Sequence, residues 1–115
     1  MKKKSEKLIN RLSGCPVEAF LKIVGQRWSS YILVVLLKNG EIRFGNLKKS
    51  IPKITSKVLT DKLRELEAVG LVKRDYVATI PPQVSYALTE RGWSLSPFLN
   101  MITEIAESWR KKGII

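Results

Sequence analysis

The sequence predicts a single, mainly helical α+β domain in which helices flank one small β-hairpin. Over several segments, apolar residues recur at steps of three and four, which is the helical period. Two short runs typical of strands flank a proline loop, and the second alternates apolar and polar residues, which is typical of a hairpin. The chain has 115 residues, 44% of them apolar, and this is the size of one ordinary domain with its own core.

The first half of the domain is predicted to begin with two helices. The first opens at Pro16, because a proline at the first helical position loses no hydrogen bond, and Gly25 caps its end. The second, residues 27–38, is apolar around most of its circumference and is expected at the centre of the core. Asn39-Gly40 is its stop signal. Residues 42–44 are long enough only for a small edge strand.

Two helices joined by a tight turn are expected next. Residues 45–50 predict a short helix, and Ile51-Pro52-Lys53 predicts the turn. Residues 55–69 carry the clearest amphipathic pattern of the chain, and Gly70 closes it. The apolar positions of this helix are Val58, Leu59, Leu63, Leu66 and Val69.

A hairpin and a terminal helix complete the predicted domain. Residues 71–77 and 84–88 are the expected strands, on either side of the Thr-Ile-Pro-Pro-Gln loop. Thr89 is suited to cap the last helix, which runs to about residue 112 and which Pro97 is expected to kink or restart.

The order helix, helix, short strand, helix, helix, hairpin, helix predicts a winged helix-turn-helix with a two-stranded wing. Residues 1–14 are expected to form a basic tail or a short helix, and residues 15–115 the domain itself. Within the domain, residues 89–112 are the expected dimerisation helix.

The charge of the chain points to a polyanionic partner. Lys and Arg number 21 against 10 Asp and Glu, for a net charge of +11. Nucleic acid is the first candidate and an anionic membrane surface the second, while a domain that is merely basic is a further alternative. The longest apolar run, residues 32–37, is far shorter than the roughly 20 residues that span a bilayer. With no secretory leader pattern and one cysteine, we expect a cytoplasmic protein without a membrane partner.

Residue types exclude most catalytic chemistry. The chain has no histidine and one cysteine, Cys15, so it can build neither a His/Cys zinc site nor a Ser-His-Asp or Cys-His arrangement. Gly-rich phosphate loops are absent. Carboxylate-only catalysis stays open, but the acids are expected on helix surfaces. We therefore expect no enzyme, no metal and no cofactor, and no pattern identifies a small-molecule effector.

The helix-turn-helix segment is the candidate DNA-contacting region. From Arg43 to Arg64 there are seven basic residues and one acid, Asp61, a net +6 in 22 positions. The helix of residues 55–69 is expected in the major groove, with its amino terminus facing a phosphate, and the hairpin along the adjacent minor groove or backbone. The candidate contact residues are Arg43, Lys48, Lys49, Lys53, Thr55, Ser56, Lys57, Thr60, Arg64, Arg74, Tyr76 and Thr79.

These candidates differ in the DNA groups that they can bind, and each could also have a role that does not involve DNA. Lysines suit phosphates, hydroxyls can bond to either phosphate or base, and Lys57 and Arg64 can both address guanine. A basic helix face can also be simply solvated. Arg64 could instead pair with Asp61 or Glu67 at helical spacing, and Tyr76 could pack within the hairpin.

Several segments resemble the HxlR family of bacterial and archaeal regulators, relatives of the MarR type. The similarity runs from Cys15 to about Trp109. The resembling segments are Cys15-Pro16-Val17-Glu18, Gly25-Gln26-Arg27-Trp28, Arg43-Phe44-Gly45-Asn46-Leu47, Leu59-Thr60 with Leu63-Arg64-Glu65-Leu66-Glu67, Gly70-Leu71-Val72, and Pro81-Pro82-Gln83-Val84-Ser85-Tyr86-Ala87-Leu88-Thr89. The family usually has a helix former or Asn in place of Gly45, so this glycine is expected to loosen the start of its helix.

The resemblance implies a homodimer that joins through its terminal helices and binds palindromic operators as a repressor or an activator. A physical reason for dimerisation is the apolar stripe between residues 98 and 109, at steps of three and four. The expected interface residues are Leu8, Leu12, Phe98, Leu99, Ile102, Ile105 and Trp109.

Some members of the family sense oxidants or electrophiles through a cysteine at the position of Cys15. This residue is expected at or just before a helix amino terminus with basic residues nearby in sequence, and both features favour the reactive thiolate. As the only cysteine it could form a Cys15–Cys15 bond between subunits or a mixed disulfide with a small thiol. The alternative is an inert, buried thiol.

Two other functions stay open at this point. A nucleoid-type protein would bind DNA with a similar salt dependence but without sequence preference. A protein-interaction module would use its basic face for an acidic partner and would not bind duplexes tightly.

Overall fold

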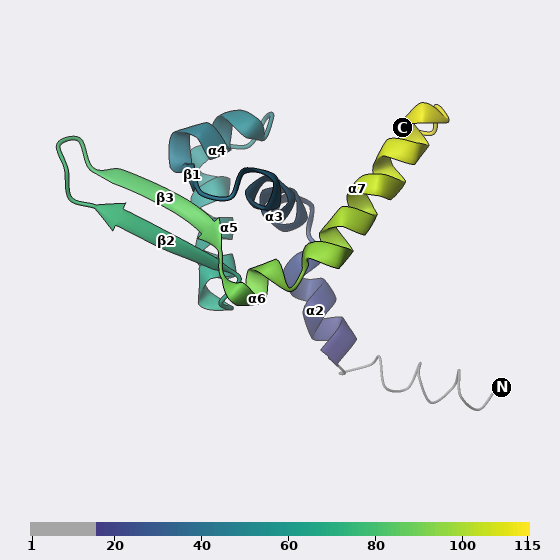
Figure 1. The fold of residues 1–115 in the computed structure, drawn as a ribbon, viewed down its shortest axis with the longest axis horizontal. Helices are drawn as coiled ribbons and strands as arrows, with labels where there is room; N and C mark the ends of the chain where they lie inside the picture. Colours follow the sequence, from purple (N-terminus) through teal and green to yellow (C-terminus); the bar gives the residue numbers. More distant parts are fainter. Residues whose placement is uncertain (1–15) are drawn as a thin grey trace.

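The computed structural model describes residues 16–115, and their order of elements confirms the predicted winged helix-turn-helix (Figure 1). The elements are α2 (Pro16–Val24), α3 (Arg27–Asn39), β1 (Ile42–Arg43), α4 (Phe44–Ser50), α5 (Ser56–Ala68), β2 (Val72–Val77), β3 (Gln83–Leu88), α6 (Glu90–Trp93) and α7 (Ser96–Lys111). The expected tail of residues 1–14, with Leu8 and Leu12, and also Cys15, lie outside the described residues.

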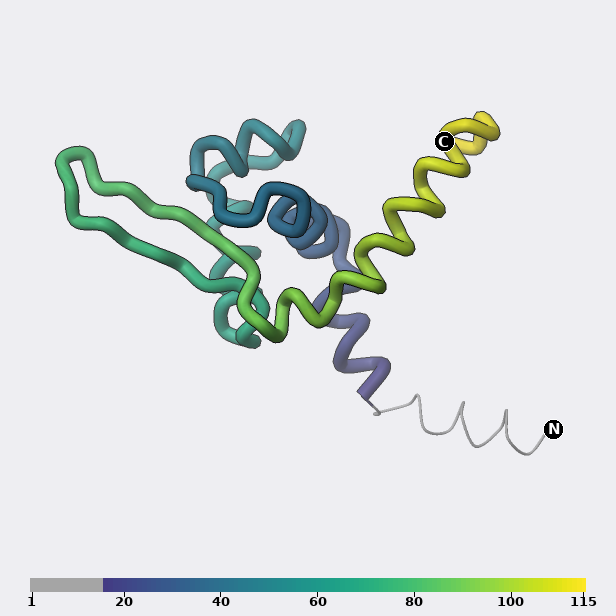
Figure 2. Tube along the Cα trace, in the orientation of Figure 1, coloured from purple at the N-terminus to yellow at the C-terminus, as the bar shows by residue number. Residues whose placement is uncertain are grey.

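Helix α3 is central in the core, as its apolar circumference predicts. Ile32, Leu33 and Leu36 are fully buried, and the helix contacts α2, α4, α5, α7 and β3. The tube in Figure 2 shows α3 enclosed between the helix-turn-helix and the start of α7. The position of α5 is therefore set by a helix that contacts four other elements as well.

The wing belongs to a three-stranded antiparallel sheet with the order β1-β3-β2, so β1 adds a third strand to the predicted hairpin. Ile42 pairs with Tyr86 on one side of β3, and Arg74 pairs with Tyr86 on the other. Tyr86 and Leu88 are buried and Val84 is half-buried, as the period of two predicts. Beyond Val72, β2 is exposed, and the hairpin extends away from the helices (Figure 1).

Glycines end two helices for different steric reasons. Gly70 follows α5 with φ of +78°, a left-handed conformation that side chains disfavour. Gly25 ends α2 at an ordinary φ, but a Cβ there would lie 2.4 Å from the Leu21 carbonyl oxygen. At Gly45 a Cβ would meet no atom within 4 Å, and α4 nevertheless begins at Phe44, so the expected loosening is not seen.

The predicted terminal helix is divided in two, as Pro97 suggested. Helix α6 ends at Trp93 and α7 starts at Ser96, with Pro97 in its first turn. Thr89 caps α6 by accepting from the Gly92 amide at 3.1 Å, and its hydroxyl donates to the Gly70 carbonyl at 2.5 Å. The start of α6 is thereby tied to the end of α5.

Among residues 16–115, no single helix combines the length and apolar composition needed to cross a membrane. Only α2 and α3 taken together reach that length and composition, with a 77° bend between them.

Candidate nucleic-acid interface

The turn between α4 and α5 is held by buried side chains on one side and is followed by a capped helix. Ile51 and Ile54 are buried, while Lys53 between them is exposed at a φ of +69°. The Thr55 hydroxyl oxygen accepts from the Val58 amide at 3.2 Å, which satisfies one of the free N–H groups of the α5 amino terminus. Thr55 is therefore a structural cap, and only its hydroxyl proton is left to meet a phosphate.

Helix α5 separates a core face from a polar face. Leu59, Leu63 and Leu66 are buried in the monomer. Ser56 and Arg64 are exposed and Thr60 is half-exposed, and these three lie four residues apart, which places them in one line along the helix. Because the apolar face is held in the core, the orientation of this polar line is set by packing.

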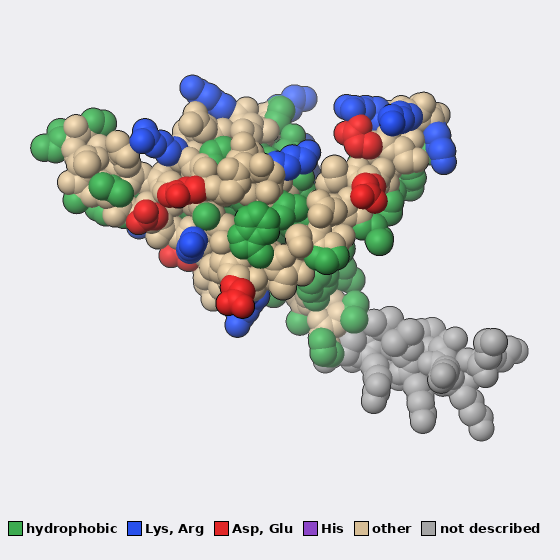
Figure 3. Space-filling model, in the orientation of Figure 1, with side chains coloured by type: hydrophobic (Ala, Val, Ile, Leu, Met, Phe, Trp, Pro, Cys, Tyr) green, Lys and Arg blue, Asp and Glu red, His purple; other side chains and the backbone are tan. Residues whose placement is uncertain are grey.

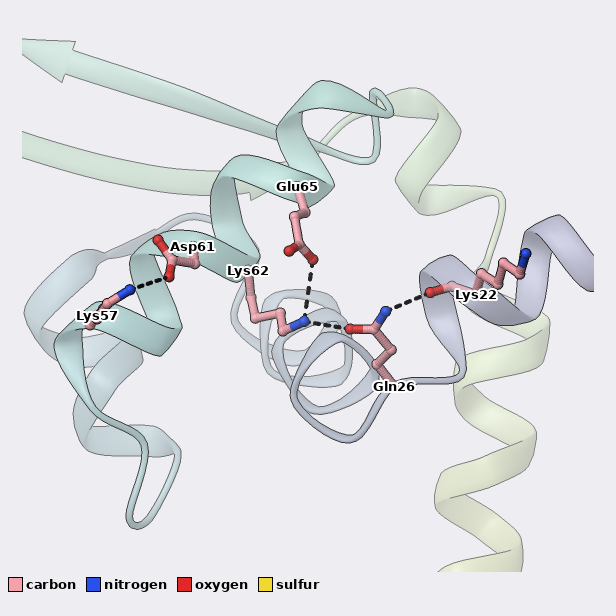
Figure 4. Close-up of polar contacts among 6 residues, drawn as sticks. All are labelled: Lys22, Gln26, Lys57, Asp61, Lys62 and Glu65. Atoms are coloured by element: carbon pink, nitrogen blue, oxygen red, sulfur yellow. Dashed lines mark hydrogen bonds and ion pairs between the residues drawn. The ribbon is translucent and has the colours of Figure 1, made fainter.

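Arg64 keeps its guanidinium available. The sequence allowed a pair with Asp61 or Glu67, but Asp61 pairs with Lys57 at 3.2 Å instead (Figure 4). Within residues 16–115, no ion pair involves Arg64. The single acid of the basic segment is therefore matched by its neighbouring lysine.

Lys62 lies on a different side of α5 from the polar line. Its Nζ donates to the Gln26 side-chain oxygen and lies 3.3 Å from a Glu65 carboxylate oxygen, and Gln26 donates in turn to the Lys22 carbonyl at 2.8 Å (Figure 4). One of the seven basic residues between Arg43 and Arg64 thus joins α5 to the α2–α3 junction and does not belong to the interface.

The wing and α5 share a groove. Thr60 of α5 lines it together with Arg43, Arg74 of β2, and Pro81 of the wing loop. A neighbouring hollow is lined by Thr60, Arg64, Glu67, Arg74 and Tyr86. The structure therefore brings Arg43, Thr60, Arg64 and Arg74 together, although they come from three separate elements, β1, α5 and β2.

Gln83 is a residue that the sequence analysis did not single out. Its side-chain oxygen accepts from Arg43 Nη2 at 3.0 Å, which holds Arg43 beside the wing. Only the pairing of β1 with β3 reveals this contact, because 40 residues separate the two in sequence.

The remaining candidates are spread around this centre. Lys48 and Lys49 are exposed in the last turn of α4. The Arg74 guanidinium lies 5.5 Å from the centre of the exposed Tyr76 ring, so Tyr76 packs on a neighbour within the hairpin while still facing solvent. Thr79 is near the end of the wing and lines neither hollow.

A second surface consists of exposed apolar side chains on α2 and α7. Phe98 meets Phe20 of α2 edge to face, with ring centres 5.5 Å apart. We call the exposed apolar set Val17, Leu21, Phe98, Met101, Ile105 and Trp109 the α2–α7 apolar surface. Met101 was not among the expected interface residues, although it lies three residues after Phe98 and four before Ile105.

Two of the expected interface residues pack against the core of the monomer. Leu99 is 0% exposed and belongs to the monomer core, which corrects its assignment to a surface between subunits. Ile102 is half-buried and packs against the same core. Part of the apolar stripe on α7 therefore packs within the monomer.

Comparison with known proteins identifies relatives over most of the chain. Residues 23–113 match the model of the HxlR-like helix-turn-helix family. A helix-turn-helix-type transcriptional regulator of Methanothermobacter thermautotrophicus is 43% identical over 90 residues, covering 78% of this chain and 68% of that protein. The regulator YybR of Bacillus subtilis is 38% identical over 109 residues, covering 89% and 86%.

Solved structures agree with these relatives. The redox regulator HypR in its oxidized form superposes with a TM-score of 0.77 at 39% identity, over 82% of this chain and 96% of that one. The reduced form of the regulator YodB from B. subtilis gives 0.66 at 33% identity, over 83% and 89%. The chain therefore belongs to the HxlR-like helix-turn-helix family, whose members are transcriptional regulators and not enzymes.

Proposed function

We propose that this regulator acts as a homodimer that recognises an inverted-repeat operator in double-stranded DNA. Each α5 enters a major groove, and each wing follows the adjacent minor groove or backbone. The observation that carries the proposal is the line of Ser56, Thr60 and Arg64 on α5, which is accessible while the opposite face of the helix is held in the core. The proposal places the protein in the cytoplasm, the compartment that holds the chromosome in bacteria and archaea.

Some side chains of the proposed interface bind phosphates and position the protein, and others bind base edges and recognise the sequence. Lys48, Lys49 and Lys53 are exposed at the end of α4 and in the turn, where point charges suit phosphates. Arg64 has no acidic partner among the described residues, so its guanidinium can bond guanine O6 and N7 as a pair. Arg43 and Arg74 face the shared groove from the wing side, where the duplex backbone would pass.

The α2–α7 apolar surface is the proposed contact between subunits. Exposed apolar side chains at steps of three and four along one helix are costly in water, and a second copy would cover them. A two-fold dimer repeats the reading helix at a distance of about one DNA turn, roughly 34 Å. This symmetry is the reason to expect an inverted repeat.

Selection from a pool of random duplexes at physiological salt tests this function. We expect enrichment of an inverted repeat, and Arg64→Ala should weaken binding to it by about 10- to 100-fold, because a bidentate guanine contact contributes roughly 1–3 kcal/mol. Lys112→Ala is the matched control, since it removes a positive charge at the end of α7 and should change binding little. Retention without any enriched sequence would favour a nucleoid-type protein, and no retention would favour an acidic protein partner.

Control of DNA binding by thiol oxidation is a second candidate function. HypR, 39% identical, is described as a redox regulator, and Cys15 directly precedes Pro16, the first residue of α2. Formation of a Cys15–Cys15 bond between subunits would transfer two electrons and the two thiol protons to the oxidant. A peroxide would leave as water and an alcohol or a second water, and a disulfide would leave as two thiols. Cys15→Ser should then abolish release of the operator under oxidant, and unchanged release would rule this mechanism out.

A further inference from the structure

The end of the wing is apolar and uncharged. Residues 77–83 read Val-Ala-Thr-Ile-Pro-Pro-Gln, with five apolar residues and no charge, and we call this segment the apolar wing tip. Ile80 at its apex is 101% exposed. Figure 3 shows hydrophobic side chains gathered at the far end of the wing, well away from the helices.

We propose that the apolar wing tip inserts Ile80 between two base pairs in the minor groove of the operator and bends the duplex there. This inference rests on the proposed function, because it adds a second point of contact to a duplex already held by α5. Apolar wedges in the minor groove partly unstack a base step and kink DNA by about 20–90°.

The tip is held in one shape. The Thr79 hydroxyl donates to the Pro81 carbonyl at 2.8 Å, and the Thr79 amide donates to the Val77 carbonyl at 2.9 Å. Pro81 and Pro82 have fixed φ angles. The backbone at the apex of such a segment loses little conformational freedom when it binds, which favours a wedge.

The distribution of charge argues for the base pairs and against the phosphates as the contact of this tip. The positive charges of the wing strands lie at the other end, at Lys73 and Arg74 on β2. Arg43 contacts only the last residue of the tip, Gln83, where β3 begins. The tip has no charged side chain to attract a phosphate. An exposed isoleucine gains most where it leaves water for an apolar surface, and in a duplex that surface is the face of a base pair.

The location of the tip ties it to DNA and not to another protein. Pro81 and Pro82 line the same groove as Thr60 of α5 and Arg74 of β2. The apolar wing tip is therefore the outward continuation of the reading surface, in the direction in which a duplex held by α5 would run.

The wedge distinguishes DNA sequences by how easily their base steps unstack. Pyrimidine–purine steps such as TA unstack most easily, so a TA or CA step is expected in the operator where the tip inserts. No hydrogen bond to a base edge is needed for this preference.

A fluorescent base tests the wedge. The probe is the selected operator with 2-aminopurine beside the flexible step, since this base brightens when it unstacks. Wild-type protein is expected to raise its fluorescence and to bind about tenfold more tightly than Ile80→Ala, which should leave the base stacked. Ile80→Val should keep most of the effect. Ile114→Ala, the same kind of truncation at another exposed position, is the matched control and should behave as wild type.

A charged variant separates the wedge from a backbone contact. Ile80→Lys should lose the fluorescence rise as Ile80→Ala does. If Ile80→Lys instead binds more tightly with a steeper salt dependence, the tip lies along phosphates and the wedge is overturned. If wild type enriches an operator but the probe stays dark and Ile80→Ala binds equally well, the wedge is wrong and the proposed function stands. If wild type enriches no sequence, both fail.

Discussion

Helices α5 and α7 are both amphipathic, but they use their apolar stripes differently. On α5, Leu59, Leu63 and Leu66 are all buried within the monomer. On α7 only Leu99 is fully buried, whereas Met101 is 61% exposed and Ile105 is 47% exposed. The same sequence pattern thus serves the monomer core in one helix and remains at the surface in the other.

The difference between the two helices matches the different roles proposed for α5 and α7. In the proposed function, α5 reads DNA and must be held rigidly, so its apolar side is used within the monomer and its polar side is free to contact DNA. In the same proposal, α7 joins two copies, so part of its apolar side stays exposed in the monomer. Four substitutions test this division, beginning with the largest expected effect.

Leu63→Ala should lower the free energy of unfolding by about 3 kcal/mol, because it removes buried methyl groups and leaves a cavity under α5. Urea unfolding at a protein concentration below the dimer dissociation constant measures this loss in the monomer. Met101→Ala, at an exposed position of α7, should change the stability of the monomer far less. Equal losses for both variants would contradict the contrast between the helices.

Ile105→Asp should raise the dimer dissociation constant at least 100-fold, about 2.7 kcal/mol, because pairing would bury an unpartnered carboxylate. Sedimentation equilibrium measures this change, and the far-UV circular dichroism of the fold should not change. Glu104→Gln, at the neighbouring exposed position, is the control. A dimer that survives Ile105→Asp would place the interface elsewhere.

Thr55→Ala should reduce stability by about 1 kcal/mol, because it removes the hydrogen bond that caps α5. Thermal unfolding measures this loss. Ser56→Ala is the matched control, since the neighbouring hydroxyl makes no capping bond, and its effect should stay below about 0.5 kcal/mol. Similar values for the two variants would mean that the cap contributes little.

Lys57→Gln should change stability by less than about 0.5 kcal/mol, because its pair with Asp61 is exposed. Its effect should be on DNA: the slope of log affinity against log salt should fall by about 0.9 for each lysine that loses a phosphate. Lys22→Gln removes an equivalent exposed pair, with Glu18 on α2, and should leave the slope unchanged. An unchanged slope for Lys57→Gln would exclude this lysine from the interface.

Local signals predicted the elements well. Thr55 and Thr89 cap the helices that they were expected to begin, and Pro97 lies where the terminal helix restarts. These residues act on groups three or four positions away, so their roles can be inferred from neighbours in the chain.

Contacts between segments that are far apart in the sequence could not be predicted from neighbouring residues. Lys62 has the same spacing as the residues of a solvated face, yet it bonds to Gln26, which is 36 residues away. Arg43 is held by Gln83 across a strand pairing. Leu99 shares a stripe with Phe98 and Ile102, and only the packing of α3 against α7 decides that it is buried.

By itself, the sequence determined the order and type of the elements and the positive charge of the helix-turn-helix segment. It also excluded zinc sites and catalytic arrangements that need histidine. These follow from composition and from interactions between neighbours in the chain. The tertiary structure alone decided which basic residues face the shared groove, which apolar residues of α7 remain exposed and where the apolar wing tip lies. The physical reason is that helical period assigns residues to a face, whereas burial depends on which other segment packs against that face.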